Sequence, residues 1–287
     1  MSELKRRRFL AGLSAGMFAP PSVVTGIEAA RYLLGAAPQR VAGTSGTGTD
    51  LPAHPLVTPP SALQPLLPPP PPAARAPLPG PGVLSVLPGD GDLLALTVDD
   101  GVSTDVVRLY TQFAKDSGIR LTYFVNGTYR SWTDNAPLLR PLVDSGQIQL
   151  GNHSWSHPDL TTLSPARIAD EITRNDTFLK NTFGIDARPY LRPPYGRHNR
   201  AVRAVAADLG YTITTMWSGS LADSTVITED FIVKMADTYF RPQNIVIGHL
   251  NHLPVTHVYG RLVEIIRARR LRTATLNDVF TRPHDAK

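Results

Sequence analysis

The sequence contains no cysteine, and this absence excludes several kinds of chemistry at once. No disulfide can staple the fold, no thiolate can bind a metal, and no cysteine can act as a nucleophile. Long apolar runs are also missing, because Phe9–Ala19 is about half of the roughly 20 residues that a membrane-spanning helix needs. No glycine-rich phosphate loop follows the first predicted strand, which removes support for nucleotide binding.

Excess positive charge is scarce outside the N-terminus. The chain has 29 Lys and Arg residues against 24 Asp and Glu residues. Since 7 basic and 3 acidic residues precede Gly82, the remainder of the chain carries 22 against 21. Most of the excess is the cluster Lys5–Arg8. We therefore expect no nucleic-acid-binding face.

The first 37 residues are typical of an export signal. The basic cluster precedes the apolar run, and Arg6–Leu10 resembles a twin-arginine signal, the bacterial route for folded cargo. The next segment, Val23–Ala37, is a poor spanning helix because it contains Glu28 and Arg31. Residues 1–37 are thus predicted to be a signal peptide, with an N-terminal anchor as the alternative, and the protein is expected to be exported or associated with the cell envelope.

Residues 38–82 are predicted to be a linker. They include the run Pro68–Pro72 among glycine, serine, threonine and alanine. Proline removes backbone donors and favours the extended polyproline II conformation, so this composition indicates a semi-rigid spacer or a disordered tail. One catalytic domain is then expected over residues 83–287, which is long enough to bury a core of its own.

Strand-like and helix-like segments alternate from residue 93 onward. Leu93–Val98 is apolar at successive positions, which fits a strand buried on both faces of a parallel sheet. Helices are expected to follow capping residues such as Ser164 and Asn199. About seven βα units result, and this repetition predicts an α/β fold with a parallel sheet, either open or closed into a barrel. The expected strands are 93–98, 121–125, 148–150, 190–191, 211–217, 245–248 and 271–275.

Ionisable residues gather after five of these strands. The carboxyl ends of parallel strands meet at one edge, where ligands and substrates bind. We therefore expect these residues to converge into one site. They are Asp99 and Asp100, His153 and His157, Arg192, Asp223, and His249.

The spacing of His153 and His157 suggests a metal site. On one helical turn, residues four apart share a face, so both imidazoles could reach one ion. Two histidines and one carboxylate form a recurrent ligand set that leaves positions open for water and substrate. Two surface histidines are the alternative for this pair taken alone.

These motifs resemble those of the polysaccharide deacetylases of the NodB-homology type, carbohydrate esterase family four. Thr97–Gly101 resembles the first motif of the family, His153–His157 the second, and Arg192–Gly196 the third. The resemblance covers about Leu93–Phe280 and implies a distorted (β/α)₇ barrel.

The resemblance implies roles for five of these residues. Asp100, His153 and His157 would bind a divalent ion, with zinc expected and other first-row metals as alternatives. Asp99 would be the general base that activates water, and Arg192 would hold Asp99 ionised and oriented. Such a metal lowers the pKa of water and polarises a carbonyl.

The remaining roles concern the leaving group and the substrate. His249 would protonate the leaving amine, and Asp223 would tune His249. The main-chain N–H of Tyr195 would help stabilise the oxyanion. Tyr195, Pro194 and Trp155 are the expected substrate contacts, although packing is the favoured alternative for Trp155.

The sequence departs from the family pattern in two places. The fourth motif usually reads Asp-x-x-Asp-Trp, whereas Ser220–Ser224 retains only Asp223. Leu250 and Asn251 follow His249, where the family often has Asp. These changes put in doubt the surroundings of the acid and an aromatic wall of the groove. His252 and His257 are expected to be loop residues.

The sequence therefore predicts an exported, metal-dependent hydrolase that removes N-acetyl groups from an amino-sugar polymer such as peptidoglycan or a chitin-like glycan. A xylan O-acetyl esterase is the close alternative, because the same attack cleaves esters. A catalytically silent glycan-binding protein on the same fold is the alternative from another class. The acetylated polysaccharide is the expected partner, with no nucleic acid and no stable protein partner, and a monomer is expected.

Overall fold

The computed structural model describes residues 66–67, 69 and 75–281. The predicted signal or anchor at residues 1–37 lies outside them. Within the described part, no helix combines the length and apolar character needed to cross a bilayer.

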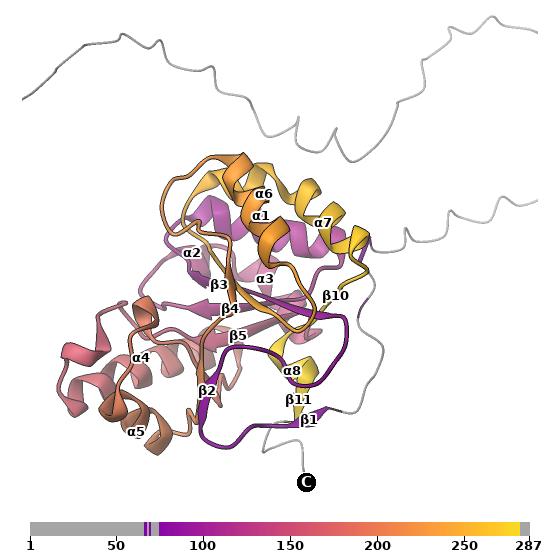
Figure 1. The fold of residues 1–287 in the computed structure, drawn as a ribbon. Coiled ribbons are helices and arrows are strands. Elements are labelled where there is room, and N and C mark those ends of the chain that lie inside the picture. Colours follow the sequence, from indigo (N-terminus) through magenta and orange to yellow (C-terminus); the bar gives the residue numbers. More distant parts are fainter. Residues whose placement is uncertain (1–65, 68, 70–74, 282–287) are drawn as a thin grey trace, which may run out of the picture. The chain divides into compact units, whose positions relative to one another are not determined.

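A curled sheet of parallel strands forms the centre of the fold (Figure 1). All seven predicted strands are present, so the predicted α/β class is confirmed. Among the described strands no ladder joins the two edges, β2 and β8, so the barrel is incomplete. The order is β2 (Gly82–Leu84), β7 (Ile213–Thr215), β6 (Tyr190–Leu191), β5 (Ile148–Asn152), β4 (Leu121–Val125), β3 (Leu93–Asp100), β9 (Ile245–His249) and β8 (Gly219–Ser220), with β10 (Arg272–Thr273) beside the start of β3.

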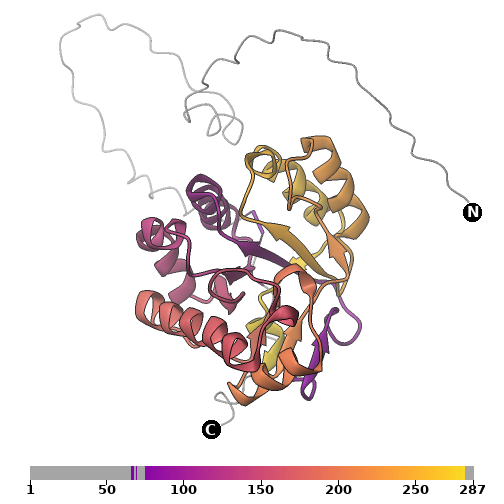
Figure 2. The same ribbon diagram turned by 90° about the vertical axis from the view of Figure 1, so that its left-hand side faces the viewer.

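Helices surround the outer face of the sheet (Figures 1 and 2). Several begin where the sequence predicts, because Ser103, Ser164, Asn199 and Thr228 each accept a hydrogen bond from a first-turn N–H. The helix Ser131–Asp134 was not predicted. The α-helices are α1 (Thr104–Ser117), α2 (Ser131–Asp134), α3 (Ala136–Asp144), α4 (Pro165–Phe183), α5 (Arg200–Asp208), α6 (Glu229–Tyr239), α7 (Tyr259–Ala268) and α8 (Leu276–Val279); the 3₁₀ turns are η1 (Leu160–Thr162), η2 (Pro194–Gly196) and η3 (Leu253–His257).

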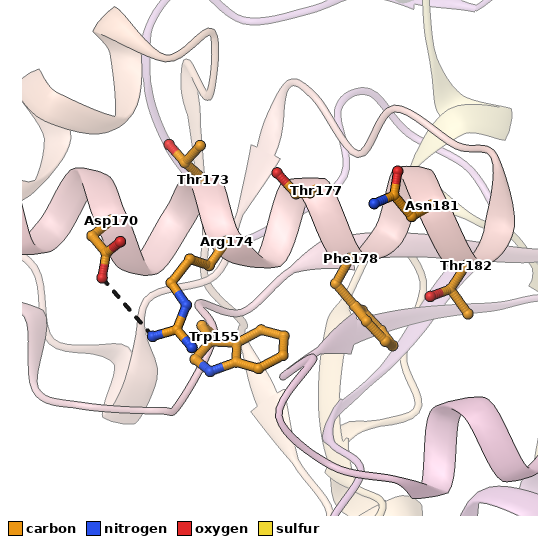
Figure 3. A pocket seen from close by; sticks show the side chains of 8 residues that line it. All are labelled: Trp155, Asp170, Thr173, Arg174, Thr177, Phe178, Asn181 and Thr182. Carbon is orange, nitrogen blue, oxygen red and sulfur yellow. Dashed lines mark ion pairs between the residues drawn. The ribbon is translucent and has the colours of Figure 1, made fainter.

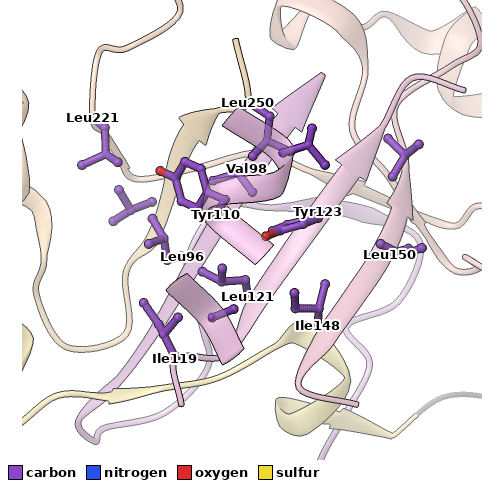
Figure 4. Close-up of a cluster of buried hydrophobic side chains, with 14 of the residues drawn as sticks. Leu96, Val98, Tyr110, Ile119, Leu121, Tyr123, Ile148, Leu150, Leu221 and Leu250 are labelled. Atoms are coloured by element: carbon purple, nitrogen blue, oxygen red, sulfur yellow. The ribbon is translucent and has the colours of Figure 1, made fainter. Parts of the chain in front are cut away.

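The sheet is buried on both faces, as the apolar run in β3 predicts. Alternate residues Leu96 and Val98 join the large core between sheet and helices, which Figure 4 shows in close-up. Ala95 lies on the opposite face with Phe124 of β4 and Phe280, in a smaller cluster inside the curl. The inner face also carries Thr97 and Asp99, so the site is built on the concave side of a rigid sheet.

Chain segments from both ends of the described range pack together away from the site. β1 (Ala76–Pro77) pairs in parallel with β11 (Phe280–Thr281). Leu67 is buried, and its N–H donates to the carbonyl of Ser117 at the end of α1. Leu67 and β1 fall within the range 38–82 that the sequence assigns to the linker, so ordered packing begins before residue 83.

Candidate functional site

The site begins at the carboxyl end of β3, where Asp99 and Asp100 are both buried. Successive strand residues normally point to opposite faces. Asp100 departs from this rule because its φ is 77°, in the left-handed region. As a result both carboxylates reach the same histidine: His153 Nε2 lies 3.6 Å from Asp99 Oδ2 and 3.3 Å from Asp100 Oδ1.

His153 and His157 converge, but not on a helical turn as the sequence analysis proposed. They lie in the loop after β5, and Ser154 and His157 have φ values of 67° and 61°. Two left-handed residues fold the loop back on itself, and the imidazole rings meet with centroids 4.9 Å apart. The pairing is thus correct, while its expected helical cause is wrong.

Buried polar side chains, two amides and one carboxylate, hold this loop in its unusual conformation. Asn126 Nδ2 donates to the carbonyls of His153 and Ser154, at 2.5 and 3.1 Å. Asn152 Oδ1 accepts from the N–H of Ser154 at 2.9 Å. Glu171 of α4 accepts from the N–H and the hydroxyl of Ser156. Left-handed residues of this kind are strained and persist where surrounding contacts fix them.

The group Asp100, His153 and His157 fits a divalent metal ion. Its three ligand atoms lie within 4.8 Å of one another. Asp100 Oδ1 is buried and has no hydrogen-bond partner among the described residues, yet it lies 3.3 Å from Nε2 of each histidine. His153 Nδ1 lies 2.6 Å from the carbonyl of Arg192, which places the ring proton on Nδ1 and leaves Nε2 as a ligand.

Electrostatics favour a charged carboxylate at this point. Burial would raise the pKa of Asp100, but the imidazoles of His153 and His157 beside Oδ1 lower it well below its ordinary value. Burial lowers the pKa of His157, and the charge of His153 lowers it further, which keeps one imidazole neutral. A neutral imidazole beside a carboxylate suits cation binding.

Arg192 and Asp99 form a buried ion pair. Both side chains are buried, and Arg192 Nη1 donates to Asp99 Oδ1 at 2.7 Å. The guanidinium also donates to the hydroxyl of Thr97 and to the carbonyls of Thr215 and Met216, so its donors are distributed over β3 and the end of β7. Phe124 covers its face, with the ring centroid 4.2 Å from Cζ. Oδ2 of Asp99 is left facing His153.

His249 and Asp223 form a second pair across the site. His249 lies beside Asp99 in the ladder between β9 and β3. Its Nδ1 is 2.9 Å from Asp223 Oδ1, and its main-chain N–H donates to Asp223 Oδ2 at 3.2 Å. Burial lowers the pKa of His249, but the hydrogen bond and charge of Asp223, with Asp99 and Asp100, raise it above the ordinary value. Loss of the rest of the fourth motif therefore leaves this pair intact.

The three expected substrate contacts differ in exposure. Tyr195 is 63% exposed, and its ring lies 4.5 Å from that of His157. Pro194 is buried in η2 and precedes the left-handed Tyr195, whose φ is 59°. Trp155 packs against Phe178 and Arg174 of α4, beside a surface hollow of about 380 Å³ (Figure 3). Packing, the favoured alternative for Trp155, agrees with this position.

Sequence reasoning missed the supporting polar residues. Asn126, Glu171 and Asn251 carry no motif of their own, and only the fold brings them to the site. Asn251 Nδ2 lies 2.6 Å from Asp100 Oδ2. Its one signal was its place two residues after His249. His252 and His257 lie beside and within η3, and His257 pairs with Glu229 rather than with the site.

Comparison with known proteins points to one family. Residues 87–214 match the family model described as polysaccharide deacetylase. Chitin deacetylase 1 of Cryptococcus neoformans is 33% identical over 135 residues, 47% of this chain and 27% of that protein. The peptidoglycan-N-acetylmuramic acid deacetylase PdaA of Bacillus subtilis is 33% identical over 128 residues, 45% of this chain and 47% of that protein. The chain thus spans less than half of these curated relatives.

A solved structure shares the fold. A carbohydrate esterase family four pseudoenzyme from Bacillus anthracis aligns with a TM-score of 0.61 and 20% identity, covering 69% of each chain. At this identity the likeness shows the architecture alone. A pseudoenzyme can keep the fold, so the shared architecture does not establish activity, which depends on the residues at the site.

Proposed function

We propose that this chain, of which residues 87–214 match the polysaccharide deacetylase model, belongs to carbohydrate esterase family four and hydrolyses N-acetyl groups on an amino-sugar polymer. Peptidoglycan and chitin-like glycans are the proposed substrates. The observation that carries the proposal is the meeting of three groups at one edge of the sheet, beyond the carboxyl ends of its strands. They are the pair Asp99–Arg192, the group Asp100–His153–His157 and the pair His249–Asp223.

The proposed metal ligands are Asp100, His153 and His157. A divalent ion held by them, with zinc proposed, would supply a Lewis acid that polarises the acetyl carbonyl and lowers the pKa of water. The support for this assignment is the unpartnered Asp100 Oδ1 and the two Nε2 atoms that face it.

Asp99 is the proposed general base. Arg192 occupies Oδ1, so Oδ2 is the oxygen that would accept a proton from the attacking water. That oxygen lies on the side of His153, next to the proposed ion site. A positioned base of this kind contributes roughly 10²- to 10⁴-fold to rate.

His249 is the proposed general acid. Asp223 accepts the Nδ1 proton, which leaves Nε2 as the atom that faces the substrate. The raised pKa of His249 favours the protonated imidazole, which is the form that a general acid requires. Its proton would go to the departing nitrogen, so that the C–N bond breaks to give acetate and a free amine.

Acetate release tests the proposal. The purified protein would be assayed on N-acetylglucosamine oligomers, peptidoglycan and acetylated xylan, with a chelator and with zinc added back. We expect release from an amino-sugar substrate, loss with chelator and recovery with zinc. Release from xylan alone would favour the O-acetyl esterase. If the metal-loaded protein releases no acetate from any acetylated glycan, the remaining interpretation is a catalytically silent glycan-binding protein.

The predicted export remains part of the proposal. An exported protein would meet peptidoglycan or a chitin-like glycan outside the cytoplasm, which agrees with the proposed substrate. Secretion of a tagged full-length chain, compared with one in which Arg6 and Arg7 are both changed to Lys, tests the twin-arginine assignment. Retention of the altered chain inside the cell is the expected result.

A further inference from the structure

Asn251 makes two polar contacts beside the proposed metal site. It lies between β9 and η3, two residues after His249. Its Nδ2 is 2.6 Å from Asp100 Oδ2, and its Oδ1 is 3.4 Å from the N–H of Val102. Both contacts require the same orientation of the amide, because the N–H of Val102 can only donate and an ionised carboxylate can only accept.

The contact makes the two oxygens of Asp100 different. Oδ2 accepts the amide proton of Asn251. Oδ1 is buried, has no hydrogen-bond partner within the described ranges, and faces Nε2 of His153 and His157. A donor fixed on Oδ2 opposes rotation of the carboxylate and leaves Oδ1 as the oxygen available to a cation. An amide is uncharged and offers this donor over the whole working range of pH.

The backbone around Asn251 is tied to the same turn as Asp100. The N–H of Leu250 donates to the carbonyl of Asp99 at 3.0 Å, and the N–H of Ser103 donates to the carbonyl of Leu250 at 3.1 Å. The Leu250 side chain is buried in the main core. The backbone next to Asn251 is therefore hydrogen-bonded to residues on both sides of Asp100, and this fixes the position of Asn251 relative to that carboxylate.

We propose that Asn251 is a positioning residue that presents Asp100 Oδ1 to the divalent ion. The same residue links the end of β9, which carries His249, to the end of β3, which carries the proposed ligand. Partners that orient a metal ligand in this way typically change metal affinity or activity 10- to 100-fold when removed. The inference rests on the proposed function, because it requires the metal site.

Metal binding, measured without substrate, tests the inference. Metal-free wild-type protein, Asn251→Ala and Asn251→Leu would be titrated with Co²⁺ while the visible absorption spectrum is recorded, and with Zn²⁺ against a chromophoric chelator. We expect affinity to fall about 10- to 100-fold in both variants, with a changed Co²⁺ spectrum, because a freed carboxylate alters the coordination geometry. Leucine keeps the branched shape of asparagine without its polar atoms, so it serves if the alanine variant does not fold.

Asn181→Ala is the matched control. Asn181 is exposed on α4, and within the described part of the chain no hydrogen bond is made by its side chain. This variant should bind metal as the wild type does. Affinities within twofold of wild type and an unchanged spectrum for both Asn251 variants would overturn the inference. So would a lower melting temperature of the metal-free protein with unaltered affinity, which indicates only a structural role. Failure of the wild type itself to bind metal would instead refute the proposed function.

Discussion

At the scale of single residues, the two adjacent carboxylates of the site have different hydrogen-bond partners. One oxygen of Asp99 accepts a hydrogen bond from Arg192, whereas one oxygen of Asp100 accepts a hydrogen bond from Asn251. In each case the other oxygen faces the histidines. One carboxylate is thus bound by a cation and the other by a neutral amide, and this difference supports the separate roles of base and ligand that we propose for them.

Replacing Asp99 tests that division. Asp99→Asn keeps the size of the side chain and the oxygen that Arg192 contacts, but the amide cannot accept a proton from water. We expect metal content to be unchanged and kcat to fall roughly 10²- to 10⁴-fold. His153→Ala should instead lose the metal. Metal analysis beside the acetate assay measures both, and an active Asp99→Asn protein would refute the assignment of the base.

The pair His249–Asp223 predicts a specific pH dependence. The raised pKa of His249 means that its proton is kept to higher pH than usual, so activity should fall as pH rises through that pKa. Asp223→Asn removes the hydrogen-bonded charge and should move this alkaline limb of kcat/KM to lower pH. Glu229→Gln, at an exposed pair with His257, is the control and should leave the limb in place. An unmoved limb in Asp223→Asn would contradict the role of His249 as acid.

At the scale of the elements, strain gathers at the ends of strands. Among the residues that the structure describes, seven non-glycine residues have positive φ, and four of them, Asp100, Ser154, His157 and Tyr195, belong to the candidate site. A left-handed residue changes the direction of the chain within one position. These residues let short loops turn side chains inward over the concave face, and the polar contacts from α4 and Asn126 hold them there.

The turn after β3 offers a stability test. Gly101 has a φ of 101°, and a Cβ added there would lie 2.4 Å from the ring of Trp132. Gly101→Ala combines an unfavourable backbone with an overpacked contact, so the free energy of unfolding should fall by about 2 kcal/mol or more. Gly260→Ala in α7 is the control, since a Cβ there meets nothing within 4 Å in the described part. Equal urea midpoints for the two variants would contradict this explanation.

The elements also show what sequence reasoning reaches and where it stops. The strands and most helices were predictable because their signals are local: buried apolar runs, caps such as Ser164, and glycines after helices. The joining of Asp99 to Arg192 and of His249 to Asp223 agrees with the geometry that parallel strand ends impose. The cause of the histidine pairing was not predictable, because left-handed backbone at Ser154 and His157 depends on contacts with Asn126 and Glu171 from elsewhere in the chain.

At the scale of the whole molecule, segments from both ends of the described range pack against the domain on the side opposite to the site. Asp99 and Asp100 lie at the carboxyl end of β3, whereas Leu67 contacts the end of α1, just before β4 begins. β1 and β11 lie together on the same side as α8 (Figure 1). The proline-rich composition around Leu67 concealed this packing, because its burial depends on one leucine rather than on a periodic pattern.

Two adjacent leucines test whether the packing of Leu67 stabilises the domain. Leu67 is 4% exposed and Leu66 is 42% exposed. Leu67→Ala should lower the free energy of unfolding by about 2–5 kcal/mol, because it removes buried apolar contacts. Leu66→Ala should change it by only about 0.5 kcal/mol. Chemical unfolding of both full-length variants measures the difference, and indistinguishable curves would show that Leu67 is not part of the folded domain.

The position of Leu67 also decides where a shortened chain can begin. Leu67 is buried and its N–H donates to the carbonyl of Ser117, so a chain that starts at residue 83 would lose this contact together with β1. A fragment that carries the domain alone should therefore begin before Leu67 rather than at the first residue of the sequence-assigned domain.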